Sequence, residues 1–172
     1  MIDSNFDQLN TSRLNGARRQ AEDFADLRRL HSDRAVMRTL SADGEPLSEA
    51  QTRQSLQAGI EHWATNGFGT WQFHARADGN FIGYCGLKRT VIIGQPEVEL
   101  LYSVGSWAWC QGFASEMGRA VVDLARGPIG LGGLIAYTLP HNRASRGVME
   151  RLGFSYEGKI VNAGLNHVLY RL

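Results

Sequence analysis

The sequence predicts a single-domain α/β protein in which a mixed β-sheet is flanked by helices. Hydrophobic residues recur at helical spacing in the first third of the chain, and a meander of three strands follows. Strand and helix patterns then alternate to the C-terminus, which is typical of a mixed sheet. The 172 residues suit one domain, and 43% hydrophobic with 20% charged residues is ordinary for a globular protein.

The N-terminal third is predicted to contain a tail, one strand and three helices. Residues 1–10 are polar, and we expect them to form a flexible tail before a domain over residues 11–172. They lack the basic and apolar parts of a signal peptide. Asn15 and Gly16 weaken the strand expected over residues 11–19. The first helix, capped by Asp23, runs toward Leu30, and the second, capped by Ser32 or Asp33, runs toward Leu40. The third helix begins at a capping box formed by Ser48 and Gln51 and runs to Asn66.

The remaining elements follow from a change of period and from turn residues. The meander is expected over residues 70–76, 81–90 and 97–104, with a turn at Asp78-Gly79. After it we expect a helix over 112–125, a strand over 134–139, a helix over 142–152, and strands over 154–159 and 166–170.

Composition and charge exclude several classes of function. Lys and Arg total 18 against 17 Asp and Glu, and a net charge of +1 leaves no basic footprint for nucleic acid. No apolar run approaches the ~18 residues of a membrane span, and Cys85 with Cys110 makes no disulfide framework. No cluster has metal-ligand spacing, so we expect no metal. The sequence favours a reduced, soluble, cytoplasmic protein.

The segment WAWCQGFASE, residues 107–116, lies between a predicted strand and a predicted helix. Small residues at such a turn let backbone N–H groups at a helix start point at one spot, which forms a site for phosphate or pyrophosphate. An ordinary strand-to-helix turn explains the spacing equally well. No GKS or GKT follows, so the segment is not a Walker loop. The Gly-rich residues 126–133 follow a helix and are interpreted as a helix stop.

Two motifs, one after the other in the chain, together resemble motifs of the GNAT acetyltransferases, especially of the Rim-type branch that acetylates protein N-termini and small amines. WCQGFASE, residues 109–116, is similar to the pyrophosphate loop of that branch, and HNRASRGVMERLGF, residues 141–154, is similar to its second signature. ELLYSVGSWAW before the loop and TSRL near the N-terminus also match, so the resemblance spans residues 11–170. It implies a mostly antiparallel mixed sheet, flanked by helices, whose two central parallel strands splay apart.

Five positions depart from the pattern of the branch, and none of them removes a phosphate-binding amide. Cys110 stands where Gly is common, and Ser106 stands where Pro is common. Leu101 replaces a frequent Gly and would narrow an acceptor pocket. Gly16 and Ala17 replace a Leu and an Arg, which weakens the expected first strand.

The resemblance implies which residues hold acetyl-CoA. The pyrophosphate would be bound by the loop amides of Cys110, Gln111, Gly112, Phe113, Ala114 and Ser115, and Trp109 before them is also expected to bind the cofactor. The pantetheine would lie along the backbone at Ser103 and Val104, which are otherwise plain ladder partners. Asn142 would bond the pantetheine arm, cap a helix, or do both. Ser145 would bond the thioester sulfur and pass it a proton, or position a water.

The catalytic base is expected to be Glu99. Glu97 and Glu99 share one face of a strand, and the resemblance puts Glu99 near the acceptor amine. The alternative for this pair is a solvated position on an exposed face. His74, His141 and an ordered water are the other candidate bases. A protein α-amine, with a pKa of about 7.7–8.0, needs only a weak base.

Cys110 and three aromatic residues receive no catalytic role. Cys110, beside a helix N-terminus, is interpreted as a small residue tolerated in the loop, with a mixed disulfide to coenzyme A as the alternative. Trp63, Trp71 and Phe73 are interpreted as core residues.

The sequence therefore predicts a cytoplasmic N-acetyltransferase. It would move an acetyl group from its co-substrate acetyl-CoA to a primary amine, by direct attack in a ternary complex. The acceptor would be a protein N-terminus or a small amine, the chain a monomer or homodimer, and neither nucleic acid nor membrane a partner. Two alternatives remain: a non-catalytic acyl-CoA-binding sensor or interaction module, which needs neither Glu99 nor Ser145, and a nucleotide-binding α/β protein of another kind.

Overall fold

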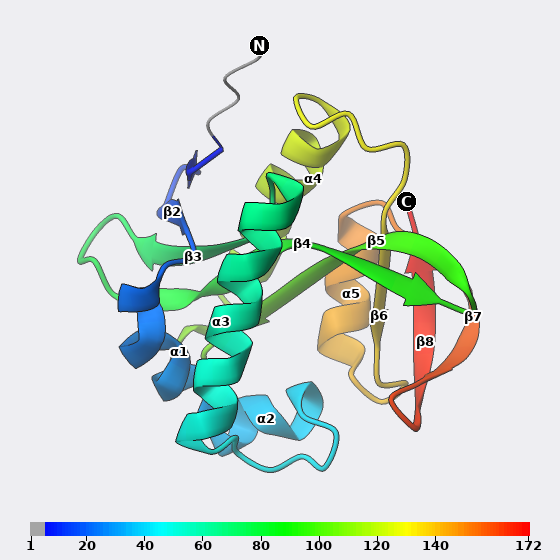
Figure 1. The fold of residues 1–172 in the computed structure, drawn as a ribbon, viewed down its shortest axis with the longest axis horizontal. Helices are drawn as coiled ribbons and strands as arrows, with labels where there is room; N and C mark the ends of the chain where they lie inside the picture. The colour runs from blue at the N-terminus through cyan, green and yellow to red at the C-terminus, as the bar shows by residue number, and fades with distance from the viewer. Residues whose placement is uncertain (1–5) are drawn as a thin grey trace.

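The computed structural model describes residues 6–172, and residues 1–5 of the predicted tail lie outside the described part. Within that part, eight strands form one sheet in the order β1-β2-β3-β4-β5-β6-β8-β7 (Figure 1). The strands are β1 (Gln8–Asn10), β2 (Leu14–Arg18), β3 (Thr70–Ala75), β4 (Phe81–Ile92), β5 (Gln95–Val104), β6 (Ile135–Thr138), β7 (Ser155–Asn162) and β8 (Leu165–Arg171). The β5–β6 pair is parallel, and the other described pairs are antiparallel.

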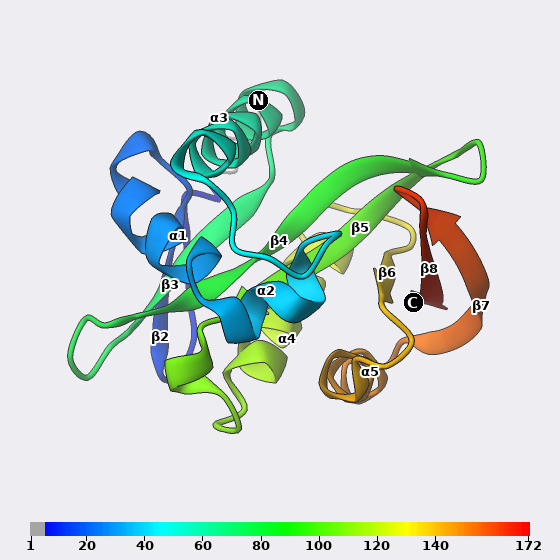
Figure 2. The same ribbon diagram turned by 90° about the horizontal axis from the view of Figure 1, so that it is seen from below.

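Five α-helices of the described chain cover the two faces of this sheet. They are α1 (Phe24–His31), α2 (Arg34–Leu40), α3 (Glu49–Asn66), α4 (Phe113–Arg126) and α5 (Arg143–Arg151), with 3₁₀ turns η1 (Ala21–Asp23) and η2 (Ser106–Ala108). Figure 2 shows α1, α2 and α3 on one side of the sheet and α4 and α5 on the other. The single-domain α/β fold with a mixed, mostly antiparallel sheet is confirmed.

The helix boundaries follow the predicted caps, although the Asp23 side chain makes no cap bond to α1. Ser48 and Gln51 form both hydrogen bonds of a capping box, and Gly67 ends α3 with φ +72°. Asp33, rather than Ser32, caps α2 through its side chain. Local sequence signals therefore set where these helices begin and end.

The N-terminal edge of the sheet differs from the sequence prediction. Residues 8–10, expected in the flexible tail, form β1 and pair with β2. The first strand forms although it contains Gly16. A side chain at that position would overlap the Leu9 carbonyl oxygen and the Phe73 ring, so the close packing here requires a glycine. Gly16 therefore permits the close approach of β1, β2 and β3.

Two hairpin turns are tighter than the sequence predicts. Ile93-Gly94 joins β4 to β5, and Ala163-Gly164 joins β7 to β8. All four residues have positive φ, which a two-residue type I′ turn requires. Neither pair is the usual Asn-Gly or Asp-Gly, so the sequence predicts shorter strands than the structure has.

Alternate residues of β5 face opposite layers of the molecule. Leu100 and Tyr102 pack in the larger core with Met117 and Val121 of α4, whereas Leu101 packs in the cluster that α1, α2 and α3 cover. The β4–β5 ladder has no register shift, so Glu97, Glu99 and Ser103 share the face of Leu101. The core interpretation of the aromatic residues is confirmed, because they are almost fully buried: Trp63, Trp71 and Phe73.

The structure gives three further facts that bear on function. None of the helices within residues 6–172 has both the length and the apolar character that a membrane span requires. Those residues also contain no group of His, Cys, Asp and Glu side chains placed to hold a metal ion. Cys85 is buried, Cys110 is exposed, and both are free thiols.

Candidate functional site

The parallel strands β5 and β6 meet at one residue pair and then diverge. Glu99 pairs with Ile135. Beyond this pair β6 continues its ladder with β8, while β5 runs on to Val104 without β6 beside it (Figure 1). A cavity of about 960 Å³ is lined by β5, the loop after it, the start of α4, β6 and α5. The expected splay of the central strands is therefore present and borders a cavity.

This cavity brings together predicted site residues that lie far apart in the sequence. Its wall includes Glu99, Ser103, Val104, Trp109, Cys110, Gly112, Phe113, Ala114, Ser115, Asn142 and Ser145. The remaining predicted residue, Gln111, is outside the described wall, and its carbonyl oxygen accepts a hydrogen bond from Arg13 at 3.0 Å. Which of these residues contact a ligand stays a prediction.

The loop before α4 leaves backbone N–H groups free at the cavity wall. Gly112 is the N-cap with φ +80° and no side-chain cap, and the first helical bond runs from the Glu116 amide to the Gly112 carbonyl. The amides of residues 113–115 therefore lack partners within the helix. Cys110 has φ +60°, a backbone region that favours Gly, which gives a physical reason for the Gly that resembling proteins commonly have there.

A short segment before β2 fixes the start of α4. The Glu116 carboxylate accepts hydrogen bonds from Thr11 Oγ1 at 2.6 Å and from the Arg13 amide at 3.0 Å, and it pairs with the Arg13 guanidinium at 2.6 Å. Arg13 also lies over the Phe113 ring, 4.3 Å from its centroid. Burial would raise the pKa of Glu116, but these hydrogen bonds outweigh it and hold the pKa low. We call residues 11–13 with Glu116 the N-terminal strap.

Asn142 and Ser145 occupy the start of α5, as predicted. Asn142 Oδ1 accepts from the Ser145 amide at 3.2 Å, which confirms the N-cap, and its Nδ2 donates to Thr138 Oγ1 at 3.1 Å. Ser145 Oγ lies 2.9 Å from the Tyr102 hydroxyl, and the Ser145 carbonyl oxygen lies 3.0 Å from it, so the one proton of the phenol can go to either oxygen. Burial raises the pKa of Tyr102, so the phenol keeps its proton at physiological pH.

Glu99 is a buried carboxylate in the cavity wall. The residue is 9% exposed, and its Oε2 accepts a hydrogen bond from the Tyr137 hydroxyl at 3.2 Å. Burial raises the pKa of Glu99, while the charge of Lys88 and the Tyr137 hydrogen bond act in the opposite direction. Glu97, on the same face, pairs with Arg171 at 2.7 Å. The two glutamates are therefore not a solvated pair, and Glu99 has the raised pKa that suits a carboxylate base.

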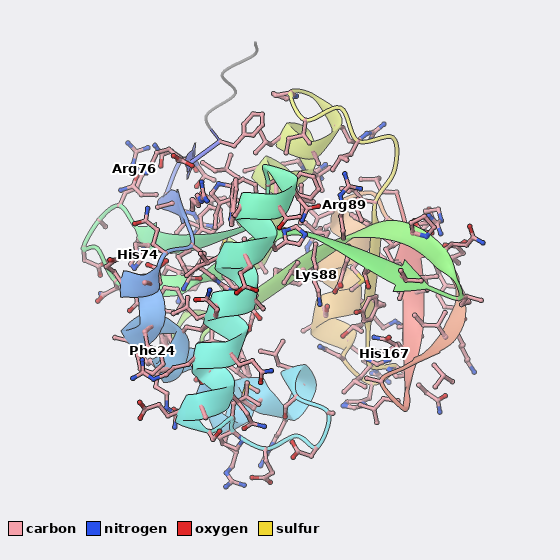
Figure 3. The ribbon with its side chains drawn as sticks, in the orientation of Figure 1. Phe24, His74, Arg76, Lys88, Arg89 and His167 are labelled. Carbon is pink, nitrogen blue, oxygen red and sulfur yellow. The ribbon has the colours of Figure 1, made fainter. Side chains whose placement is uncertain are left out.

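The two histidines considered as bases lie in different places. His141 lines the cavity, and His74 is not part of its described wall. His74 Nε2 lies 2.8 Å from Asp26 Oδ2 on α1. Figure 3 shows His74 far from His167, a histidine of β8 that does line the cavity.

Among the side chains of the cavity wall that the sequence does not single out, five carry a phenol or a guanidinium group: Tyr84, Tyr102, Tyr137, Arg143 and Arg151. Tyr102 lies inside the ELLYSV segment of the resemblance, but strand period alone does not name the partner it meets. Arg151 Nε donates to Ser115 Oγ at 3.1 Å, which links the end of α5 to the start of α4. No local signal predicts this contact, because the two residues come from separate helices.

Two further segments contribute to the same wall. Residues 39–42 form the end of α2 and the segment after it, and Asn162, Ala163, Leu165 and His167 belong to the β7–β8 hairpin. Among the described wall residues Glu99 is the one carboxylate, whereas Arg143 and Arg151 carry positive charge. The cavity therefore combines one buried acid with two cationic groups, of which Arg151 contacts the start of α4.

Comparison with known proteins gives a family. The model of the acetyltransferase (GNAT) domain matches residues 13–155 of the chain. A curated relative, FsC-acetyl coenzyme A-N(2)-transacetylase of Aspergillus fumigatus, is 32% identical over 136 residues, which cover 74% of this chain and 56% of that protein. The chain thus spans 64% and 56% of the length of two curated relatives that it matches.

Comparison with solved structures gives the fold. An acetyltransferase from Agrobacterium tumefaciens has a TM-score of 0.81 at 23% identity, over 96% of this chain and 93% of the other. RimL, a ribosomal L7/L12 alpha-N-protein acetyltransferase in complex with coenzyme A, has a TM-score of 0.79 at 16% identity, over 96% and 97% of the two chains. Likeness at these identities concerns the arrangement of the elements.

Proposed function

The chain belongs to the acetyltransferase (GNAT) domain family, and we propose that it is an N-acetyltransferase that uses acetyl-CoA as its co-substrate. The acetyl group would pass to a primary amine by direct attack in a ternary complex. The observation that carries this proposal is the one cavity on which the α4 loop, Ser145 and Glu99 meet. Acyl transfer to an amine needs a cofactor-binding loop, a proton donor and a proton acceptor within reach of each other.

The α4 loop and two arginines would hold the phosphates of acetyl-CoA. The free amides of residues 113–115 lie at the positive end of the α4 dipole, which attracts anions. Arg143 and Arg151 add positive charge to the same wall. This combination supports a pyrophosphate site. Acetyl-CoA, when bound, supplies the thioester.

The open edge of β5 and the start of α5 would hold the pantetheine arm. Beyond Glu99, β5 has no ladder pair with β6 in the described chain, so the backbone at Ser103 and Val104 presents strand groups toward the cavity. Asn142 lies across the same cavity and would add a side-chain hydrogen bond. An extended chain with amide groups suits such an edge.

Glu99 and Ser145 would handle the two protons of the reaction. Glu99 would take a proton from the acceptor ammonium, so that a neutral amine attacks the thioester carbonyl. Ser145 would donate a hydrogen bond to the leaving sulfur, with Tyr102 fixing its hydroxyl. A raised pKa on Glu99 supports the first role, since it brings the pKa of the base closer to that of an amine.

The charges of the cavity favour an acceptor with one positive charge. A polyamine or aminoglycoside carries several ammonium groups, and Glu99 is the one carboxylate of the described wall. The names of two similar proteins support an amine acceptor, since one specifies N(2) transfer and the other an alpha-N-protein substrate. We propose a protein N-terminus or a small monoamine as the acceptor.

Nothing in the structure or the comparisons favours a non-catalytic acyl-CoA sensor. Membership of the GNAT domain family excludes the alternative of a nucleotide-binding protein with another fold. A cytoplasmic location, a monomeric or dimeric state, and the lack of nucleic-acid or membrane partners stay predictions from the sequence. Size-exclusion chromatography with light scattering would determine the oligomeric state directly.

The proposed activity is tested by release of free thiol from acetyl-CoA. The panel contains N-terminal peptides, amino acids, small monoamines, polyamines and aminoglycosides. We expect thiol release with a peptide or monoamine, and mass spectrometry should show one acetyl group on its nitrogen. Coenzyme A binding without thiol release on the whole panel would instead favour the sensor.

A further inference from the structure

Glu99 is connected through Tyr137 to the β7–β8 hairpin. Asn162 Nδ2 donates to the Tyr137 hydroxyl oxygen at 3.2 Å, and the same hydroxyl lies 3.2 Å from Glu99 Oε2. A phenol has one proton to donate, and an ionised carboxylate can only accept. Because Asn162 occupies a lone pair of the phenol, the proton of Tyr137 points at Oε2 of Glu99.

We propose that Tyr137, held by Asn162, is a positioning residue whose proton occupies Oε2 of Glu99 and leaves Oε1 to receive the proton of the acceptor amine. This inference rests on the proposed acetyl transfer. Glu99 lines the cavity, and its Oε1 accepts no hydrogen bond from the residues that the structure describes. An N–H bond of the acceptor ammonium breaks as an O–H bond forms on Oε1. The electron pair stays on nitrogen, and the acid later releases its proton to solvent.

The Tyr137 ring is held so that its hydroxyl keeps this direction. Its ring packs edge-on against His167, with centroids 5.2 Å apart and an interplanar angle of 86°. His167 Nδ1 is itself 3.0 Å from the Leu165 carbonyl oxygen. Burial, then the charge of Glu99, raises the pKa of Tyr137, so the phenol donates and does not ionise at working pH.

The groups around Glu99 determine the sign of the pH effect. Lys88 and Tyr84 on β4 and Tyr137 on β6 act on Glu99, and His167 on β8 packs against Tyr137. On β5 itself, Glu97 is paired with Arg171 of β8. The Tyr137 hydrogen bond lowers the pKa of Glu99, against burial. Removing the hydroxyl raises that pKa further, so less Glu99 is ionised at low pH.

Two measurements on Tyr137→Phe and Asn162→Ala test the inference. The first is the pH profile of kcat/KM for the acceptor, and the second is the titration of the Glu99 carboxyl by ¹³C NMR. We expect the Glu99 midpoint to move to higher pH in Tyr137→Phe, and less far in Asn162→Ala. The loss in kcat/KM should be roughly tenfold at pH 6, as for a lost hydrogen bond to a charged group, and smaller at pH 9.

A control variant assigns the titration to Glu99, since Glu99→Gln removes the resonance from the spectrum and identifies it. An unchanged Glu99 midpoint in both test variants would overturn the inference, as would a shifted midpoint with unchanged rates. If the wild type acetylates no amine, the proposed function fails, and the midpoints still decide whether Tyr137 positions Glu99.

Discussion

Ser145 is a weak acid, and its contact with Tyr102 determines what its hydroxyl does. The Tyr102 hydroxyl lies within hydrogen-bond distance of both Ser145 Oγ and the Ser145 carbonyl oxygen. When Tyr102 donates to Oγ, the serine proton is free to point elsewhere, because a hydroxyl has one donor and two acceptor positions. Both residues line the cavity, so the proton would be available to a sulfur atom there.

We predict that Ser145→Ala lowers kcat by ~10²-fold with little change in acetyl-CoA binding. The hydrogen bond strengthens as negative charge develops on sulfur, and an interaction confined to the transition state affects kcat. Tyr102→Phe should lower kcat less, and the double variant should equal Ser145→Ala, since Tyr102 acts through the serine. Steady-state kinetics with melting curves check this.

Asn142→Ala provides the contrast at the same helix start. Loss of a pantetheine bond should raise KM for acetyl-CoA, and loss of the N-cap should cost about 1 kcal/mol of stability. Full kcat for Ser145→Ala at saturating acetyl-CoA would remove the serine from the chemistry. Additive losses in the double variant would give Tyr102 a separate role.

At the scale of elements, the start of α4 depends on contacts that are distant in the sequence. The N-terminal strap brings Thr11 and Arg13 onto Glu116, in the first turn of α4. Arg13 Nη1 then bonds the Gln111 carbonyl oxygen in the loop. The strap therefore fixes the loop whose amides face the cavity.

We predict that Glu116→Gln weakens coenzyme A binding several-fold and lowers stability by about 1 kcal/mol. The amide keeps part of the hydrogen bonding but loses the ion pair, which is half exposed at Arg13 and therefore worth less than a buried one. The control is Glu49→Gln, which breaks an exposed ion pair with Arg53 on α3. Isothermal titration calorimetry measures the affinity of each variant for coenzyme A. Equal affinities of the two variants would contradict the role of the strap.

Local signals predict elements well in this chain and long-range contacts poorly. The capping box at Ser48 and the glycine at Gly67 identify α3 almost to the residue. The turn at Ile93-Gly94 is missed, because a β-branched residue with positive φ is rare. β1 is missed because three residues carry too little pattern, and its pairing with β2 is a tertiary effect.

At the scale of the molecule, a buried histidine couples stability to pH. His31 on α1 is 3% exposed, and its Nδ1 lies 3.2 Å from Thr52 Oγ1 on α3. Burial, then the charges of Arg19 and Arg28, lowers the pKa of His31 from 6.5 to about 4. The folded chain therefore holds His31 neutral, while the unfolded chain takes up a proton below its ordinary pKa.

We predict that His31 makes stability fall as the pH drops from about 6.5 toward 4, by an amount on the order of 2 kcal/mol. Its contribution is complete above pH 6.5 and is lost as protonation of the unfolded chain sets in. In His31→Gln this part of the slope should disappear, and in the exposed control His141→Gln it should persist. Urea unfolding at several pH values measures the difference, and equal slopes in wild type and His31→Gln would contradict it.

The candidate site was predictable where a motif is local and not where partners converge. The loop of residues 109–116 and the helix start at Asn142 can be found by order and spacing. Tyr102 and Tyr137 lie in ordinary strand patterns, and their roles depend on Ser145 and Glu99 from other elements. A sequence gives the face of a strand, and only the fold gives what lies opposite.

The central claim is that the cavity at the β5–β6 splay binds acetyl-CoA through the α4 loop. Its most direct test is calorimetric titration of coenzyme A into the wild type and Gly112→Asp. At Gly112 a Cβ would lie 3.6 Å from Arg13 Nη2, which is an ordinary contact, but φ +80° strains any side chain there, so a melting curve must first show that the variant folds. The matched control is Gly79→Asp, which places the same residue at φ +73° in a hairpin turn with open space around it. We predict micromolar or tighter binding for the wild type and the control, and at least a tenfold loss in Gly112→Asp from repulsion of the pyrophosphate. Equal affinity in a folded Gly112→Asp would contradict the claim.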